Sequence, residues 1–302
     1  MSGRAFLGAL GLLGLSAVAL AACKGKPSAD AVPVGSVTLP APIASSLPID
    51  PKVVSAVVNK QGLPPYAGAT GTITGVVTIA GDPAPDMPEV LAKIPSDCDS
   101  AKATYGKLFR EGAGRTLADA VVGVTGYEGY LPEVSPAEVA DATGCAWNAR
   151  TYVLTFGQSL DVRSRDSRAY VPDLMGAQLK AQILALPRGD AVHLYPEQPG
   201  RYVLTDSMRL FMVANVLVVA FPTHAVTGTD GHFTIPHVPV GKVKVSALLP
   251  PMREVDKEVE VHAGELVEVP FTLTFDRKEW DTPRGSTPAG ASSTSPPASS
   301  AH

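Results

Sequence analysis

The sequence predicts an all-β protein built as a sandwich or barrel, and three features support this class. Short segments rich in Val, Ile and Thr alternate apolar and polar residues, as in "TGTITGVVTIAG" from Thr70 to Gly81. Turns containing Gly and Pro separate these segments. Helical signals are confined to three short stretches, which are residues 50–62, 135–143 and 177–186. Many short strands joined in this way are typical of β-sandwiches and β-barrels.

The remaining strands follow from the same alternation. They are expected within residues 118–127, 149–165 (two strands split at Gly157-Gln158), 190–205 (two strands around Pro199-Gly200), 212–221, 232–236, 241–249, 253–264 and 266–275. The run from Leu210 to Phe221 is the longest apolar stretch after the N-terminal segment. It falls short of the ~20 residues that a membrane-spanning helix needs. Its valines predict a central strand buried on both faces.

The N-terminal segment has the layout of a secretory signal, with Arg4 before an apolar run. Leu20-Ala21-Ala22-Cys23 resembles the bacterial lipobox, which implies cleavage after residue 22 and lipidation of Cys23. An ordinary secretory signal and an N-terminal membrane helix are the alternatives. Lys24 after the lipidated residue resembles the signal for an outer-membrane destination, facing the periplasm or the cell surface. More than one acyl chain gives stable membrane anchoring.

Two segments of biased composition flank the predicted β-rich body. Residues 23–69 are rich in Pro, Ala and Ser and are expected to form a tether. Residues 277–302 form a Ser/Pro-rich tail that is expected to be disordered. Cys98 and Cys145 remain after Cys23 is set aside, and outside the cytoplasm such a pair predicts a disulfide, with two buried thiols as the alternative.

Composition and motifs exclude several classes of function. The formal net charge is -4 and no long run of one sign occurs, so nucleic-acid binding is not expected. Neither a Gly-x-Ser-x-Gly motif nor a phosphate-binding loop is present. We therefore expect no enzymatic activity and no cofactor.

The segment from Ala225 to Leu248, "AVTGTDGHFTIPHVPVGKVKVSAL", resembles a carboxypeptidase regulatory-like domain, a small transthyretin-like sandwich. Asp230-Gly231 suits a hairpin turn that needs positive φ. The resemblance implies a second domain over residues 222–276 and carries no peptidase activity. His-Glu-x-x-His, the zinc-binding motif, is absent from the sequence.

The stretch before this segment resembles the cupredoxin-like domain of secreted methylamine-utilisation-like proteins. The resemblance rests on strands like Gly71–Pro85 and Leu117–Gly126, on Gly144-Cys145, on the turn Pro199–Tyr202, and on Val216–Val219. It implies a cupredoxin-like sandwich over residues 70–221, followed by the carboxypeptidase regulatory-like domain.

The copper ligands of this family are expected to be lost. A mononuclear copper centre of this type uses two His, one Cys and a weak axial ligand such as Met. The resemblance puts Asp206 at the Cys position, Arg209 at a His position and Met212 at the axial position. Residues 162–176, where another His is expected, contain none. Because Arg cannot ligate a cation, the sequence predicts a site without metal.

Three weaker patterns have structural explanations as their alternatives. His224, His232 and His237 could form a surface metal site, or each could be a separate turn or strand residue. Arg163, Arg165 and Arg168 could receive an anion, or pair with Asp161 and Asp166 between them. The aromatic residues Tyr127, Tyr130 and Trp147 could contact a sugar, or pack in the core.

Together these features predict a lipid-anchored envelope protein with a non-catalytic binding or structural role. Its partners would be the membrane, through the N-terminal lipid, and an unidentified envelope protein or glycan. The alternative is a periplasmic copper-binding or electron-transfer protein with an altered site. In the first case, Asp206 and Arg209 are expected to pair and fill the former copper pocket.

Overall fold

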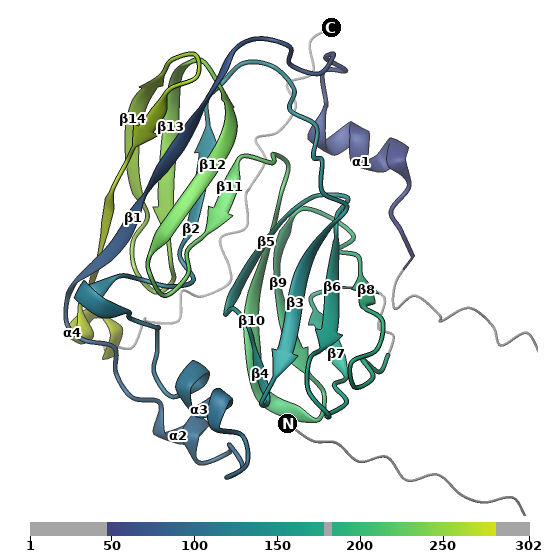
Figure 1. Ribbon diagram of the computed structural model, residues 1–302, viewed down its shortest axis with the longest axis vertical. Coiled ribbons are helices and arrows are strands. Elements are labelled where there is room, and N and C mark those ends of the chain that lie inside the picture. Colours follow the sequence, from purple (N-terminus) through teal and green to yellow (C-terminus); the bar gives the residue numbers. More distant parts are fainter. Residues whose placement is uncertain (1–46, 178–182, 282–302) are drawn as a thin grey trace, which may run out of the picture. The chain divides into compact units, whose positions relative to one another are not determined.

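The computed structural model describes residues 47–177 and 183–281, and these residues confirm the all-β class. They form two β-sandwiches, each made of two four-stranded sheets (Figure 1). The expected signal peptide, Cys23, most of the tether and nearly all of the C-terminal tail lie outside the described residues. The same holds for half of the helix expected at 177–186.

The first sandwich lies between residues 137 and 219. One of its sheets has the order β4-β3-β6-β8 and the other β5-β10-β9-β7. The strand bounds are β3 (Ala137–Thr143), β4 (Ala146–Trp147), β5 (Thr151–Thr155), β6 (Ser159–Ser164), β7 (Pro172–Met175), β8 (Val192–Leu194), β9 (Gly200–Asp206) and β10 (Arg209–Val219). Large apolar side chains from both sheets, such as Trp147, Leu160 and Leu204, fill the space between them.

The second sandwich contains the remaining strands. In one sheet, β12 and β15 flank the first part of β1 and β16 pairs with its second part; the other sheet has the order β11-β2-β13-β14. The bounds are β1 (Thr70–Gly81), β2 (Val121–Thr125), β11 (His224–Val226), β12 (His232–Pro239), β13 (Gly241–Leu248), β14 (Val255–Val261), β15 (Leu266–Glu268) and β16 (Phe271–Phe275). Ile73, Val77 and Phe271 belong to its separate core.

The sheet pairing corrects the expected place of two strands. The division at residues 221 and 222 put β1 and β2 in the first sandwich. Instead, β1 pairs with β12, β15 and β16, and β2 pairs with β11 and β13. The first sandwich is therefore inserted between β2 and β11 of the second. The prediction failed because strand patterns show which residues alternate but not which distant strand they pair with.

Strand β10 is central in its sheet, as predicted, but it is not buried on both faces. Met212 and Val216 are buried, whereas Leu210 is 75% exposed and Val213 is 39% exposed. Burial alternates along the strand because one face of the sheet packs on the core and the other faces solvent.

The helix predictions gave different outcomes. Helix α1 (Pro51–Val58) is confirmed, and the Asp50 side chain caps its N-terminus by accepting a hydrogen bond from the Lys52 amide at 2.8 Å. The helix expected at 135–143 is wrong, since Ala137–Thr143 is strand β3, parallel to β6. There the pairing with β6 overrides the local helix-start signal. No helix within the described ranges is both long and apolar enough to cross a membrane.

Several short helices were not predicted from sequence. They are α2 (Pro88–Leu91), α3 (Asp99–Tyr105), a 3₁₀ turn (Ala113–Arg115) and α4 (Arg277–Asp281).

A buried carboxylate joins residues of the two sandwiches. Asp119, which precedes β2, is 2% exposed. It accepts hydrogen bonds from Arg110 Nε at 2.7 Å and Nη2 at 2.6 Å. It also accepts one from the backbone amide of Arg150, just before β5, at 2.7 Å. This arrangement fixes the start of β5 against the second sandwich.

Candidate functional site

The β9–β10 hairpin carries the three positions at which the family resemblance would put copper ligands. Asp206 ends β9, Arg209 begins β10, and the two residues are paired across the turn. Met212 follows on β10, within an irregularity of the strand register between Arg209 and Val213. One hairpin therefore holds all three positions.

The carboxylate of Asp206 is completely buried and its oxygens are engaged within the protein. Its residue exposure is 0%. Oδ2 accepts a hydrogen bond from the Val171 amide at 2.7 Å, and Oδ1 accepts one from the Met208 amide at 3.0 Å. Arg209 Nη1 lies 3.4 Å from Oδ1. This carboxylate ties the hairpin to the segment before β7.

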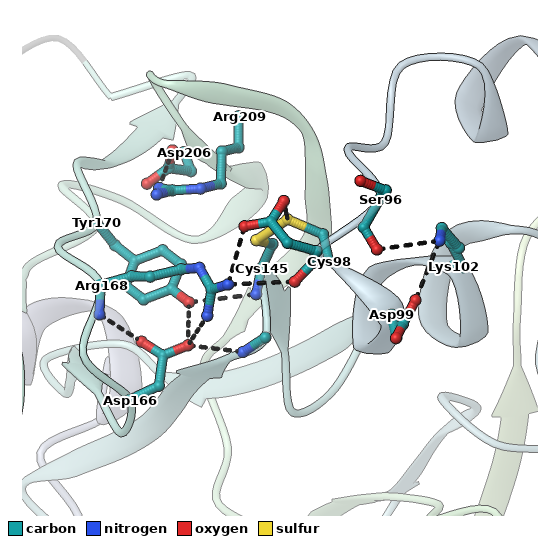
Figure 2. Close-up of a disulfide and its surroundings, with 12 residues drawn as sticks. Ser96, Cys98, Asp99, Lys102, Cys145, Asp166, Arg168, Tyr170, Asp206 and Arg209 are labelled. Atoms are coloured by element: carbon teal, nitrogen blue, oxygen red, sulfur yellow. Dashed lines mark hydrogen bonds and ion pairs between the residues drawn. A yellow bond between two sulfur atoms is a disulfide. The ribbon is translucent and has the colours of Figure 1, made fainter.

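Arg209 adds a second connection to the same segment. Its Nη1 donates to the Ala169 carbonyl oxygen at 3.1 Å. Its Cζ lies 4.8 Å from the centre of the Tyr170 ring (Figure 2). A guanidinium placed over an aromatic face is stabilised by the ring quadrupole. The expected pairing of Asp206 with Arg209 is thus present. The Asp206 side chain of the pair is fully buried, and the Arg209 side chain is partly exposed.

Met212 behaves as a core residue. It is 0% exposed and belongs to the apolar cluster of the first sandwich. In the part of the chain that the structure describes, no group of three or more His, Cys, Asp or Glu side chains is arranged to hold a metal ion.

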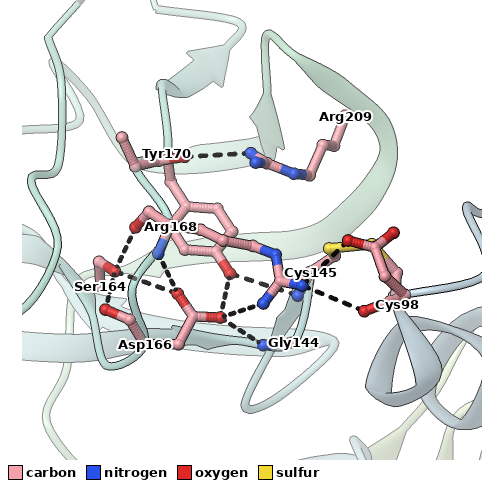
Figure 3. Close-up of polar contacts among 10 residues, drawn as sticks. Cys98, Gly144, Cys145, Ser164, Asp166, Arg168, Tyr170 and Arg209 are labelled. Atoms are coloured by element: carbon pink, nitrogen blue, oxygen red, sulfur yellow. Dashed lines mark hydrogen bonds and ion pairs between the residues drawn. A yellow bond between two sulfur atoms is a disulfide. The ribbon is translucent and has the colours of Figure 1, made fainter.

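A polar network lies behind the hairpin, centred on Asp166 (Figure 3). Its carboxylate accepts hydrogen bonds from the amides of Gly144 and Arg168, both at 2.8 Å, and from the Tyr170 hydroxyl at 3.0 Å. Burial by itself would raise the pKa of Asp166, but these hydrogen bonds and the Arg168 guanidinium outweigh it and lower that pKa. Burial also raises the pKa of Tyr170 to about 12. Tyr170 therefore stays neutral and connects Asp166 to Arg209.

The predicted disulfide is confirmed and lies next to this network. The Sγ atoms of Cys98 and Cys145 are 2.08 Å apart. The amide of Cys145 donates to the Tyr170 hydroxyl at 3.2 Å, and Arg168 Nη2 donates to Asp97 Oδ2 at 3.1 Å (Figure 2). Both cysteines are almost fully buried and neither is free to act as a thiolate ligand.

The basic residues at the end of β6 and in the β6–β7 connection are neutralised by acidic neighbours, in accordance with the second of the two expectations. Arg163 and Arg165 both pair with Asp141, at 2.9 and 3.0 Å. Arg168 pairs with Asp97 and Asp166. The partners differ in part from the expected ones, since Asp161 instead contacts His193 at 2.7 Å.

The histidines flagged in the sequence do not form a cluster among the described residues. His232 and His237 are exposed. The Nε2 atom of His224 lies 3.2 Å from Thr155 Oγ1, which donates to Glu133 Oε2 at 2.7 Å. Burial lowers the pKa of His224 to about 4, although Glu133 acts in the opposite direction. His224 is therefore neutral near pH 7.

The flagged aromatic residues have two different roles. Trp147 is 1% exposed and packs in the first core, 6.1 Å from Tyr170 between ring centroids. Tyr127 packs against the second core and, together with Tyr130, also lines a groove of about 780 Å³ with residues at the end of α1 and after it. Sequence reasoning missed the contribution of the α1 segment, because that segment is more than sixty residues away in the chain.

No family model and no curated protein matches the chain. Among solved structures, amicyanin from Paracoccus versutus is 11% identical, with a TM-score of 0.25, over 28% of this chain and 81% of that one. A reduced amicyanin variant is 16% identical, with a TM-score of 0.24, over 32% and 99%. An oxidised variant is 19% identical, with a TM-score of 0.25, over 29% and 87%. At these TM-scores the likeness carries no argument about the fold or the site of this chain.

Proposed function

We propose that this chain is a lipid-anchored envelope protein with a non-catalytic binding role, in which a cupredoxin-like sandwich operates without copper. In this proposal the second sandwich is a carboxypeptidase regulatory-like domain. The observation that supports the metal-free scaffold is the state of Asp206. The carboxylate at the expected thiolate position is buried and hydrogen-bonded by two backbone amides.

The chemistry of the hairpin is unfavourable to copper. A metal ion at this position would have to displace the Val171 and Met208 amides from Asp206, which costs about 1–3 kcal/mol for each donor left unsatisfied. It would also lie near the permanent positive charge of Arg209. The hairpin therefore keeps its shape through hydrogen bonds and an ion pair.

A copper titration tests the metal-free scaffold. Mature protein, in reduced and oxidised buffers, would be titrated with copper and followed by visible absorption and thermal unfolding, with amicyanin treated in parallel. We expect amicyanin to develop a thiolate charge-transfer band and this protein to show neither a band nor a stoichiometric rise in Tm. A saturable spectral change that disappears in Asp206→Ala would overturn the proposal.

Membrane anchoring is supported by the sequence Leu20–Cys23 followed by Lys24. We expect metabolic labelling with an alkyne fatty acid to mark the wild-type chain and not Cys23→Ser. Fractionation would then place the labelled chain with the outer membrane. Labelling that persists in Cys23→Ser would contradict lipidation at this residue.

A further inference from the structure

We infer that the groove beside α1 binds a neutral oligosaccharide. Three segments form this groove: residues 57–63, residues 127–131 and residues 220–222. The inference rests on the proposed non-catalytic binding role and assigns that role a site and a class of ligand.

The size of the groove suits a small chain-like ligand. Its volume is about 780 Å³, which lies within the range of about 300–1,000 Å³ typical of small-molecule sites. A second cavity of about 380 Å³ shares Val58, Tyr130 and Leu131 with it. The two cavities therefore adjoin along a shared wall, and a ligand of several linked units could extend from one to the other.

The side chain of one tyrosine in the groove and the backbone of the other are held by hydrogen bonds. The Tyr127 hydroxyl is hydrogen-bonded to Thr223 Oγ1 at 3.0 Å. The backbone of Tyr130 is fixed because its carbonyl oxygen accepts a hydrogen bond from the Tyr66 amide at 2.8 Å.

The loop that carries both tyrosines, residues 126–130, packs so closely against Tyr66 that position 129 requires glycine. Gly129 has a φ of +103°, and a Cβ atom there would lie 2.9 Å from Tyr66 Cδ2. The loop "GYEGY" can thus present its two tyrosines only with glycine at this position. A ring that is held before binding, as that of Tyr127 is, loses little conformational entropy when it packs against the C–H face of a sugar.

The charges at the groove favour a neutral ligand. Lys60, Gln61 and Glu128 line it and are exposed. Within residues 47–177 and 183–281 their side chains form no hydrogen bond or ion pair with the protein. One ammonium and one carboxylate cancel in net charge, which disfavours a phosphorylated or strongly cationic ligand. Sugar hydroxyl groups both donate and accept hydrogen bonds. The Lys60 ammonium can donate to them, the Glu128 carboxylate can accept from them, and the Gln61 amide can do either.

The apolar part of the wall complements this polar set. Val57, Val58 and Leu131 contribute aliphatic surface, and Phe221 adds a third ring. Asn59 is not available to a ligand, because its side chain makes two hydrogen bonds to the backbone of Leu63, at 2.8 and 2.9 Å. These bonds shape the turn after α1 and so hold Lys60 and Gln61 at the groove.

Glycan binding by the complete mature chain in detergent tests the inference. Cello-, malto-, manno- and chito-tetraose would be screened as immobilised probes, and any tetrasaccharide retained would be titrated by calorimetry. We expect at least one to bind. Tyr127→Ala and Tyr130→Ala should each weaken binding by about tenfold, whereas Tyr130→Phe, which keeps the ring, should retain most of the affinity. Trp280→Ala, which removes an exposed ring on α4, is the control and should bind as the wild type does.

Two results would overturn the inference. One is that none of the four tetrasaccharides binds to protein with a normal thermal unfolding profile. The other is binding that Tyr127→Ala and Tyr130→Ala leave unchanged. Either result leaves the metal-free scaffold standing, which only copper binding would contradict.

Discussion

The β9–β10 hairpin and the groove beside α1 use polar residues in opposite ways. In the hairpin, Asp206 is buried and its oxygens are taken by protein donors. In the groove, Lys60 and Glu128 are exposed and form no ion pair with the described residues. Polar groups with internal partners stabilise a fold, whereas exposed groups without such partners remain available to a ligand. The difference separates a structural site from a candidate binding site in the same chain.

The largest loss of stability is expected when the Asp206 side chain is removed. Asp206→Ala leaves the Val171 and Met208 amides without an acceptor and takes the counter-ion from Arg209. Breaking such a buried pair costs about 3–5 kcal/mol. For a domain of this size, that corresponds to a decrease in Tm of roughly 10 °C, measurable by calorimetry. A change below about 1 kcal/mol would show that the carboxylate does not hold the hairpin.

Removing the disulfide should cause the next largest loss of stability. The bridge between Cys98 and Cys145 spans a sequence separation of 47 residues and is buried behind the hairpin. Replacing both cysteines with Ala should lower the free energy of unfolding by about 2–5 kcal/mol. Denaturant unfolding of the double variant would measure this loss. Equal stability of the variant and the wild type would mean that the bridge adds nothing to the fold.

The partly buried His224 lies beside Thr155 at the end of β5, and it should make the stability of the fold sensitive to acid. Its folded-state pKa of about 4 lies below the ordinary value of 6.5, so the unfolded chain binds the extra proton first. The neutral form contributes stability above pH ~6.5, and this contribution is lost as pH falls towards ~4. The loss reaches about 3 kcal/mol in total. His224→Gln should flatten this part of the stability–pH curve, and an unchanged curve would refute the assignment.

The smallest change in stability is expected for substitutions of charged residues in the groove. Glu128→Ala and Lys60→Ala remove exposed side chains, so stability should change by less than about 0.5 kcal/mol. Thermal unfolding alongside Asp206→Ala gives the direct contrast between the two regions. A large loss at Glu128 would show that this residue is structural and not reserved for a ligand.

Much of the fold was predictable from local sequence patterns. Alternation along Thr70–Gly81 identified a strand, and Cys98 and Cys145 identified the disulfide. The partners of β1 and β2 could not be predicted, because period-2 patterning does not specify which strand lies alongside. The helix expected at Ser135–Thr143 failed for a related reason, since its backbone hydrogen bonds go to a parallel neighbour, β6.

The candidate site was predictable to a similar degree. The family resemblance singled out Asp206, Arg209 and Met212, and the structure holds all three on one hairpin. The roles of Val171, Ala169 and Tyr170 could not be foreseen, because two of these contacts come from the backbone. In the groove, Tyr127 and Tyr130 stood out as aromatic residues, but Lys60 joins them only through the folding of α1 onto the sandwich.

A crystal structure of the protein grown with excess copper tests whether the hairpin is free of metal. We expect no anomalous copper peak at the hairpin. We also expect that Asp206 Oδ2 remains within hydrogen-bond distance of the Val171 amide and that Arg209 stays over Tyr170. A copper ion bound by Asp206 and Met212, with Arg209 displaced, would contradict this expectation.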